Sequence, residues 1–93
     1  MKIKVSCDDK YESQKLASLI FIKNSKETYV TKILNIIEKE VIVELKDKSA
    51  HSILLKDVDQ VEKFADFIQS VIEKEHKIIS TKVFDNEIEI IKE

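Results

Sequence analysis

The chain has 93 residues, 43% of them hydrophobic, which is enough to enclose one core but not two. Its 16 basic residues, all lysines, nearly balance 18 acidic residues and leave a formal net charge of −2. This balance excludes the strongly basic profile of a polyanion-binding protein and the composition of a disordered chain. We therefore expect a single domain over residues 1–93.

The cysteine content and the hydropathy of the chain indicate the cellular compartment in which it is expected. Cys7 is the only cysteine, so no intramolecular disulfide can form, and a reducing environment is expected. The longest apolar run, Leu19 to Ile22, is far too short to cross a bilayer, and the N-terminus lacks an apolar stretch of signal-peptide length. The sequence predicts a cytoplasmic protein that does not enter a membrane.

The chain contains no glycine, proline, tryptophan or arginine. Because these residues have GC-rich codons, their absence indicates an AT-rich genome, such as that of a phage or mobile element. Without glycine, asparagine or aspartate must adopt positive φ where a turn requires it, at some conformational cost. We predict Asn24, Asn35 and Asn86 at such positions.

The first part of the chain predicts two strands. Lys2 to Ser6 alternates lysines with Ile3 and Val5, as in an edge strand protected by lysines. Residues 7–14 are polar and are predicted to form a loop. Leu16 to Lys23 is apolar on both parities, which is typical of a strand covered on both faces. A helix from Asp9 to Ile22 is the alternative.

The next segment predicts a first helix at Lys26 to Lys39. Ser25 can cap it, and Val30, Ile33 and Ile37 recur at helical spacing. Its many β-branched residues lose side-chain freedom in a helix, however. A strand at Tyr29 to Ile37 is therefore the alternative.

The clearest periodic signal predicts a helix from Asp57 to His76. Apolar residues recur there every three or four positions, Asp57 can serve as N-cap, and Gln60 follows at the spacing of a reciprocal cap. A hairpin is predicted on each side of this helix. The first covers residues 40–56, and the second joins Lys77 to Phe84 with Glu87 to Lys92 through Asp85 and Asn86.

These elements predict an α+β fold with a mostly antiparallel sheet and two helices packed on one face, in the order ββαββαββ. With the two alternatives above, the order becomes βαβββαββ, a ferredoxin-like plan with two added strands. Lys2 and Lys4 can pair across the first and last strands with Glu87 and Glu89, so the termini are expected to lie close together.

No motif for catalysis or cofactor binding is present. Cys7 stands beside Asp8 and Asp9, whose charges would raise the pKa of a thiol and make it less reactive. Neither His51 nor His76 has a second histidine or cysteine at metal-ligand spacing. We expect no catalytic residue, no cofactor and no metal, and hence no enzyme.

The candidate interaction surface is on the predicted helix at Asp57 to His76. Acidic residues line one flank of its helical wheel, and Phe67 on the other flank can act as an apolar anchor. The predicted partner-binding residues are Asp59, Glu62, Asp66, Phe67 and Glu73. The sheet offers a second surface, because an uncovered face carrying Ile42, Leu54, Ile78 and Phe84 would favour a homodimer.

The sequence thus predicts a small non-catalytic module that binds a protein, with a basic surface as the complementary partner. An accessory or inhibitory protein of a phage or mobile element, such as an anti-defence protein, fits this size, acidity and lack of site motifs. The alternative is a nucleic-acid-associated regulatory protein that uses the lysine-rich N-terminal half, where residues 1–35 hold seven lysines and four acids.

Overall fold

The computed structural model describes residues 1–93 and contains six strands and two helices, which confirms the α+β class. Its elements follow the order βαβββαββ, so the alternative order is confirmed and ββαββαββ is wrong. The elements are β1 (Lys2–Ser6), α1 (Lys10–Ile20), β2 (Val30–Ile37), β3 (Glu40–Leu45), β4 (Ala50–Leu54), α2 (Val58–Ile72), β5 (Ile78–Phe84) and β6 (Glu87–Lys92).

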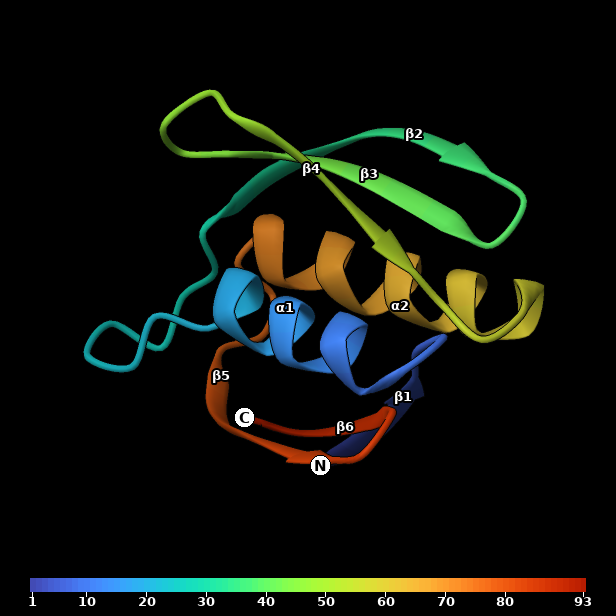
Figure 1. Ribbon diagram of the computed structural model, residues 1–93. Helices are drawn as coiled ribbons and strands as arrows, with labels where there is room; N and C mark the ends of the chain where they lie inside the picture. The colour runs from blue at the N-terminus through green and yellow to red at the C-terminus, as the bar shows by residue number, and fades with distance from the viewer.

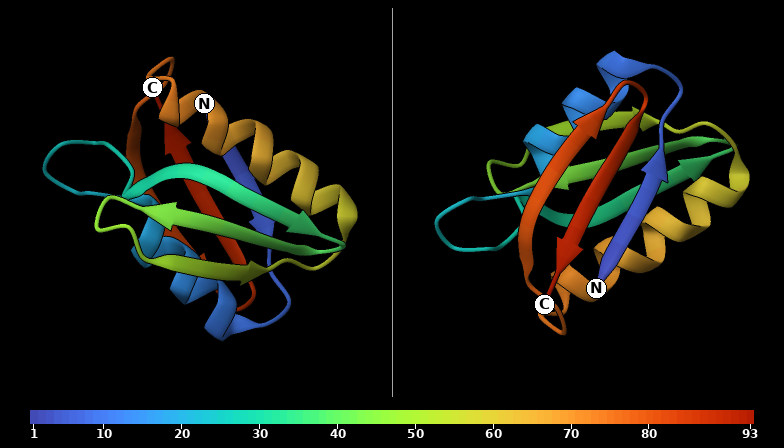
Figure 2. Two further views of the ribbon diagram at one scale, coloured as in Figure 1. Left: turned by 90° about the horizontal axis from the view of Figure 1, so that it is seen from above. Right: turned by 90° about the horizontal axis from the view of Figure 1, so that it is seen from below.

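The strands form two sheets of three rather than one sheet. All pairings are antiparallel, with strand orders β1-β6-β5 and β2-β3-β4. Both helices lie between the two sheets, so the molecule has three layers (Figures 1 and 2). Helix α1 contacts β4 on one side and β5 and β6 on the other, and α2 contacts β2 and β1. This arrangement differs from a ferredoxin-like sheet, which has helices on one face only.

The element order consists of two βαββ halves. The elements begin at residues 2, 10, 30 and 40 in the first half and at 50, 58, 78 and 87 in the second. Each sheet combines the first strand of one half with the hairpin of the other half. The halves have therefore exchanged their first strands, and α1 and α2 occupy equivalent places in the fold.

The two first strands meet where they enter the helices. Cys7 and Leu55 form an antiparallel bridge between the ends of β1 and β4. Backbone hydrogen bonds of 3.0 Å flank this bridge in both directions, one from the N–H of Asp8 to the carbonyl of Leu54 and one from the N–H of Lys56 to the carbonyl of Ser6. This junction joins the two sheets.

Side chains from the two helices complete the same junction reciprocally. Gln60 of α2 accepts the backbone N–H of Ser6 at 2.8 Å, and Glu12 of α1 accepts that of Leu54 at 3.0 Å. Each helix thus satisfies a backbone donor on the first strand of the other half, at a position where an unpaired N–H would cost stability.

Helix boundaries follow from the caps. Asp9 and Asp57 are the N-caps, and each accepts the backbone N–H three residues later, at 2.9 and 3.0 Å. The predicted cap at Asp57 is confirmed, but Gln60 does not complete a reciprocal cap, because its side chain accepts the N–H of Ser6 instead. Helix α2 ends at Ile72 rather than at His76, because Lys74 adopts φ 62° and closes a Schellman motif with bonds from Lys74 N–H to Val71 and from Glu75 N–H to Ser70.

Two of the preferred assignments in the first half are wrong. The segment predicted as loop and strand, residues 7–23, contains α1, and the predicted helix at Lys26 to Lys39 is replaced by β2. In β2, register shifts insert two extra residues, Thr31 and Leu34. The residues paired opposite the buried face of β3 are therefore Val30, Ile33 and Ile36, whose spacing of three imitates a helix.

Positive φ occurs at Asp85 in the predicted Asp85–Asn86 loop, but at none of the three predicted asparagines. Asn24, Asn35 and Asn86 do not adopt it, whereas Lys26, Glu38, Lys48, Lys74 and Asp85 do. The turns explain the difference, because these positions are fixed by the ends of helices and by hairpin loops rather than by the local residue type. Lys74 follows α2, for example, and Glu38 and Asp85 each open a two-residue hairpin loop.

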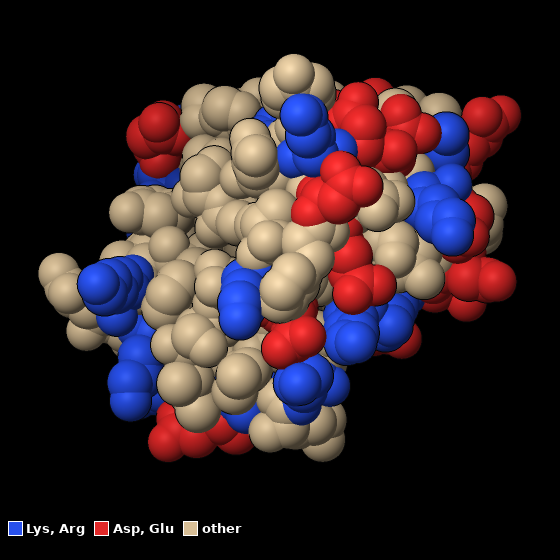
Figure 3. Space-filling view, turned by 60° about the horizontal axis from the view of Figure 1, so that its bottom comes forward, with Lys and Arg blue, Asp and Glu red and all other residues tan.

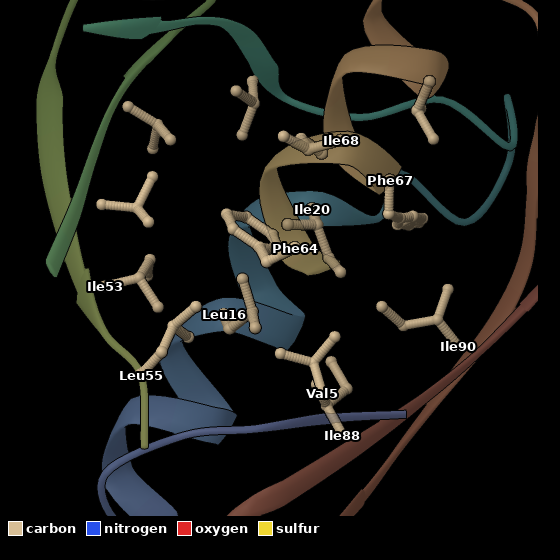
Figure 4. Close-up of a cluster of buried hydrophobic side chains, with 14 of the residues drawn as sticks. Val5, Leu16, Ile20, Ile53, Leu55, Phe64, Phe67, Ile68, Ile88 and Ile90 are labelled. Carbon is tan, nitrogen blue, oxygen red and sulfur yellow. The ribbon is translucent and has the colours of Figure 1, made fainter. Parts of the chain in front are cut away.

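One hydrophobic cluster of 18 buried residues fills the space between the sheets and around the helices. Phe64 lies at its centre with Leu16 and Ile20 of α1 beside it (Figure 4). The termini lie together as predicted, because β1 pairs with β6. Lys2 forms an ion pair with Glu89 at 3.3 Å, and the Met1 amino group donates to the carbonyl of Lys92.

Replacing Lys74 with glycine should raise the free energy of unfolding by about 0.5–1 kcal/mol. Glycine has no Cβ and so avoids the strain of the left-handed region. The free energy gained in this way exceeds the cost of the extra conformational entropy that glycine gives the unfolded chain. Urea denaturation measures the change. The control is Lys63→Gly on the exposed middle of α2, which should lower the free energy of unfolding by about 1 kcal/mol. A loss of stability in Lys74→Gly as well would contradict the assigned backbone.

Candidate functional site: the acidic flank of α2

Four of the five predicted partner-binding residues lie on one exposed flank of α2 and its C-cap. Asp59, Glu62, Asp66 and Glu73 are all exposed, and we call this row the acidic flank. At a rise of about 1.5 Å per residue, the row extends over about 21 Å. The structure therefore brings these four carboxylates to one side of the molecule.

The acidic flank is not neutralised within the chain. The five ion pairs of the protein involve other carboxylates, so no lysine Nζ lies within 4.0 Å of any of these four. Glu62 and Asp66 stand four residues apart on the helix, where like charges repel. Glu73 is the C-cap, at the negative end of the helix dipole. Glu62, Asp66 and Glu73 are therefore unfavourable for helix stability, whereas Asp59 lies in the first turn, where the helix dipole favours a negative charge.

Phe67, the fifth predicted residue, is not available to a partner. Its side chain is 3% exposed and belongs to the hydrophobic core, so its assignment as an exposed anchor is wrong. In Figure 4 it lies on the same side of α2 as Ile90 of β6. A helix between two sheets is covered on a wider arc than a helix on one sheet, and position 67 falls within that arc.

Helix α1 provides an internal comparison for the acidic flank. Because both helices begin at equivalent places, Tyr11, Gln14 and Ser18 of α1 correspond to Asp59, Glu62 and Asp66 of α2. All three are exposed, Tyr11 at 68%, and none carries a charge. The same position in the fold is therefore occupied without acids in one half, so the architecture does not require them in the other.

An exposed apolar segment lies beside α2. In β2, a strand at the edge of its sheet, Leu34, Ile36 and Ile37 are 44%, 44% and 51% exposed. The tip of the β2–β3 hairpin lies next to the start of α2 (Figure 2), where Val58 is also exposed. The sequence did not reveal this segment as a surface, because the same residues were predicted to form a helix.

The apolar face predicted to favour a homodimer does not exist as one surface. Ile78 is fully buried and Phe84 is exposed on the β1-β6-β5 sheet, whereas Ile42 and Leu54 belong to the other sheet. The four residues are separated because the strands divide into two sheets whose inner faces both cover the helices. These four residues therefore form no common face through which two copies of the chain could associate.

No cluster of three or more His, Cys, Asp or Glu side chains is placed to hold a metal ion. His51 contacts Ser49, and His76 contacts the carbonyl of Glu93, so the two histidines have separate local partners. No helix is long and apolar enough to cross a membrane. The chain matches no protein-family model, no curated protein and no solved structure.

Cys7 is fully buried at the junction of the two sheets. Burial is the main cause that raises the pKa of its thiol to about 12, and the nearby carboxylates of Glu12 and Asp9 contribute to this shift. The thiolate is the reactive form of cysteine, so this environment opposes nucleophilic chemistry. Cys7 acts as a core residue in this structure.

The raised pKa makes stability depend on alkaline pH. The folded protein holds the Cys7 proton more tightly than the unfolded chain, whose thiol titrates near 9.0, so this stabilisation is complete below pH 9 and is lost as the pH rises toward 12. Between pH 9 and 10.5 the free energy of unfolding should fall by about 1–2 kcal/mol more in the wild type than in Cys7→Val. Urea denaturation at both pH values measures this fall, and an equal fall in the two proteins would contradict the prediction.

Proposed function

We propose that this protein is a non-catalytic interaction module that binds a basic protein surface through the acidic flank of α2 and the neighbouring exposed residues of β2. One observation carries the proposal: equivalent helices present an acidic row in one half and an uncharged row in the other. Three of the four carboxylates disfavour the helix, and such charges are a common property of binding surfaces, where function is maintained at some loss of stability.

The composition of the surface indicates how it would bind. Leu34, Ile36 and Ile37 supply apolar area, which provides most of the affinity in an interface. The acidic flank supplies orientation and a faster association with a positively charged partner. A carboxylate row about 21 Å long can also occupy a surface that otherwise holds phosphates. We therefore propose an inhibitory action on a nucleic-acid-binding protein, in keeping with the phage or mobile-element origin that the composition indicates.

The alternative, direct nucleic-acid binding through the N-terminal lysines, has less support. Lys2, Lys15 and Lys32 are each within an ion pair with a glutamate. The face in Figure 3 carries acidic and basic side chains intermixed rather than a continuous basic surface. A phosphate backbone is best held by several unpaired basic groups on one face.

The double reversal Glu62→Lys with Asp66→Lys should abolish partner binding while the fold is retained. The matched control is Gln14→Lys with Ser18→Lys, which places the same charges at the equivalent positions of α1 and should leave binding intact. The measurement is quantitative capture of the natural host's proteins by each tagged variant at increasing salt, with circular dichroism to verify folding.

Two results would contradict the proposal. The first is a host protein retained equally by wild type, the α2 variant and the α1 control. The second is equal loss from both variants, which would indicate a general effect of added lysines. If binding depends on the acidic flank, capture from wild type should also weaken as salt is raised, because exposed charges are screened.

A further inference from the structure

A cleft opens between the end of α2, the start of β2 and the loop before it. Its volume is about 260 Å³, and it adjoins a smaller cavity of about 40 Å³ that shares Glu27, Val71 and Lys74 as lining residues. Val30, Val71 and Ile72 supply apolar wall, and Thr28 and Thr31 supply hydroxyl groups. The mixed lining resembles that of a site for a small molecule, and the volume is just below the usual range of about 300–1,000 Å³.

Basic side chains converge on this cleft. Lys26, Lys46, Lys74 and Lys77 line the two adjoining cavities together with His76, and Glu27 is the only carboxylate there. Lys46 is paired with Glu27 at 3.3 Å, whereas the other three lysines have no acidic partner within 4.0 Å. A protein with a net negative charge thus concentrates unpaired positive charge at one concave site.

Two of these lysines line the smaller cavity from opposite halves of the chain. Lys26 and Lys74 lie at equivalent positions in the two halves, each beyond the end of its helix and each with positive φ, 60° and 62°. Their common cavity therefore lies where the halves face each other, at the ends of the helices opposite the Cys7–Leu55 bridge. Two strained backbone positions carry the same charge into one site.

The dipole of α2 does not account for the whole cluster. Lys74, His76 and Lys77 follow the C-terminus of α2 and offset its negative end. Lys26 and Lys46 reach the cleft from the other half, from the loop before β2 and from the end of β3. Like charges brought together from separate segments repel one another unless an anion lies between them.

We infer that this cleft binds a small phosphorylated ligand. Its phosphate is held by Lys26, Lys74 and Lys77, since lysine ammonium groups act as point charges toward a dianion. The rest of the ligand lies in the larger cavity against Val71 and Ile72. Thr28 accepts the N–H of Val30 through its hydroxyl oxygen, which leaves the hydroxyl proton for a ligand oxygen.

The test is a titration of the ¹⁵N-labelled full-length protein at physiological ionic strength with pyrophosphate, adenosine monophosphate, adenosine and a single-stranded oligonucleotide. Adenosine monophosphate and pyrophosphate should shift the amide signals of Thr28, Thr31 and Lys74, and adenosine should not. The double variant Lys26→Gln with Lys74→Gln should weaken this binding by at least about tenfold. Lys48→Gln, another lysine at positive φ but outside the cleft, should bind as wild type does.

Three results would overturn the inference. These are the absence of shifts with either phosphate probe, equal shifts with adenosine, and phosphate binding that is unchanged in the double variant. Binding of the oligonucleotide alone would also overturn it, in favour of a nucleic-acid surface. Melting curves establish that both variants are folded, so a loss of binding reports on the cleft.

Discussion

The junction between β1 and β4 is the constraint on which the rest of the structure depends. At the Cys7–Leu55 bridge the two halves exchange backbone hydrogen bonds, and Gln60 and Glu12 satisfy the next donors reciprocally. Because the first strand of each half pairs with the hairpin of the other half, the two hairpins form two separate sheets. The helices are enclosed between these sheets. The wide buried arc of α2, which includes Phe67, follows from this enclosure.

Residues whose local pattern agrees with their tertiary role could be predicted from the sequence. The strand at Lys2–Ser6, the two later hairpins, the cap at Asp57 and the pairing of the terminal strands are of this kind. Helix α1 is hard to recognise in the sequence because Ser13, a polar residue, occupies a core position in its first turns, where its hydroxyl lies within hydrogen-bond distance of the carbonyl oxygens of Lys10 and Asp85. The Asp9 to Glu12 spacing, which resembles a capping box, was the available signal.

The candidate site could be predicted only in part, for the same physical reason. The acidic flank follows from helical periodicity alone, so its four carboxylates were placed correctly. The exposure of β2 and the lysine cleft depend on contacts between the halves, and two bulges gave β2 the spacing of a helix. The repeat itself is hidden because equivalent positions keep their backbone role but change residue type, as in Cys7 and Leu55 or Glu12 and Gln60.

Exchange of the first strands is the central claim, and fragments divided in the exposed β3–β4 loop test it most directly. Labelled residues 1–48 alone should not show the native NMR spectrum, because β1 lacks its partner β6. Adding unlabelled residues 49–93 should produce the native spectrum at a ratio of one to one. A fragment 1–48 that is already a folded monomer, with a spectrum unchanged by its partner, would contradict the exchanged architecture.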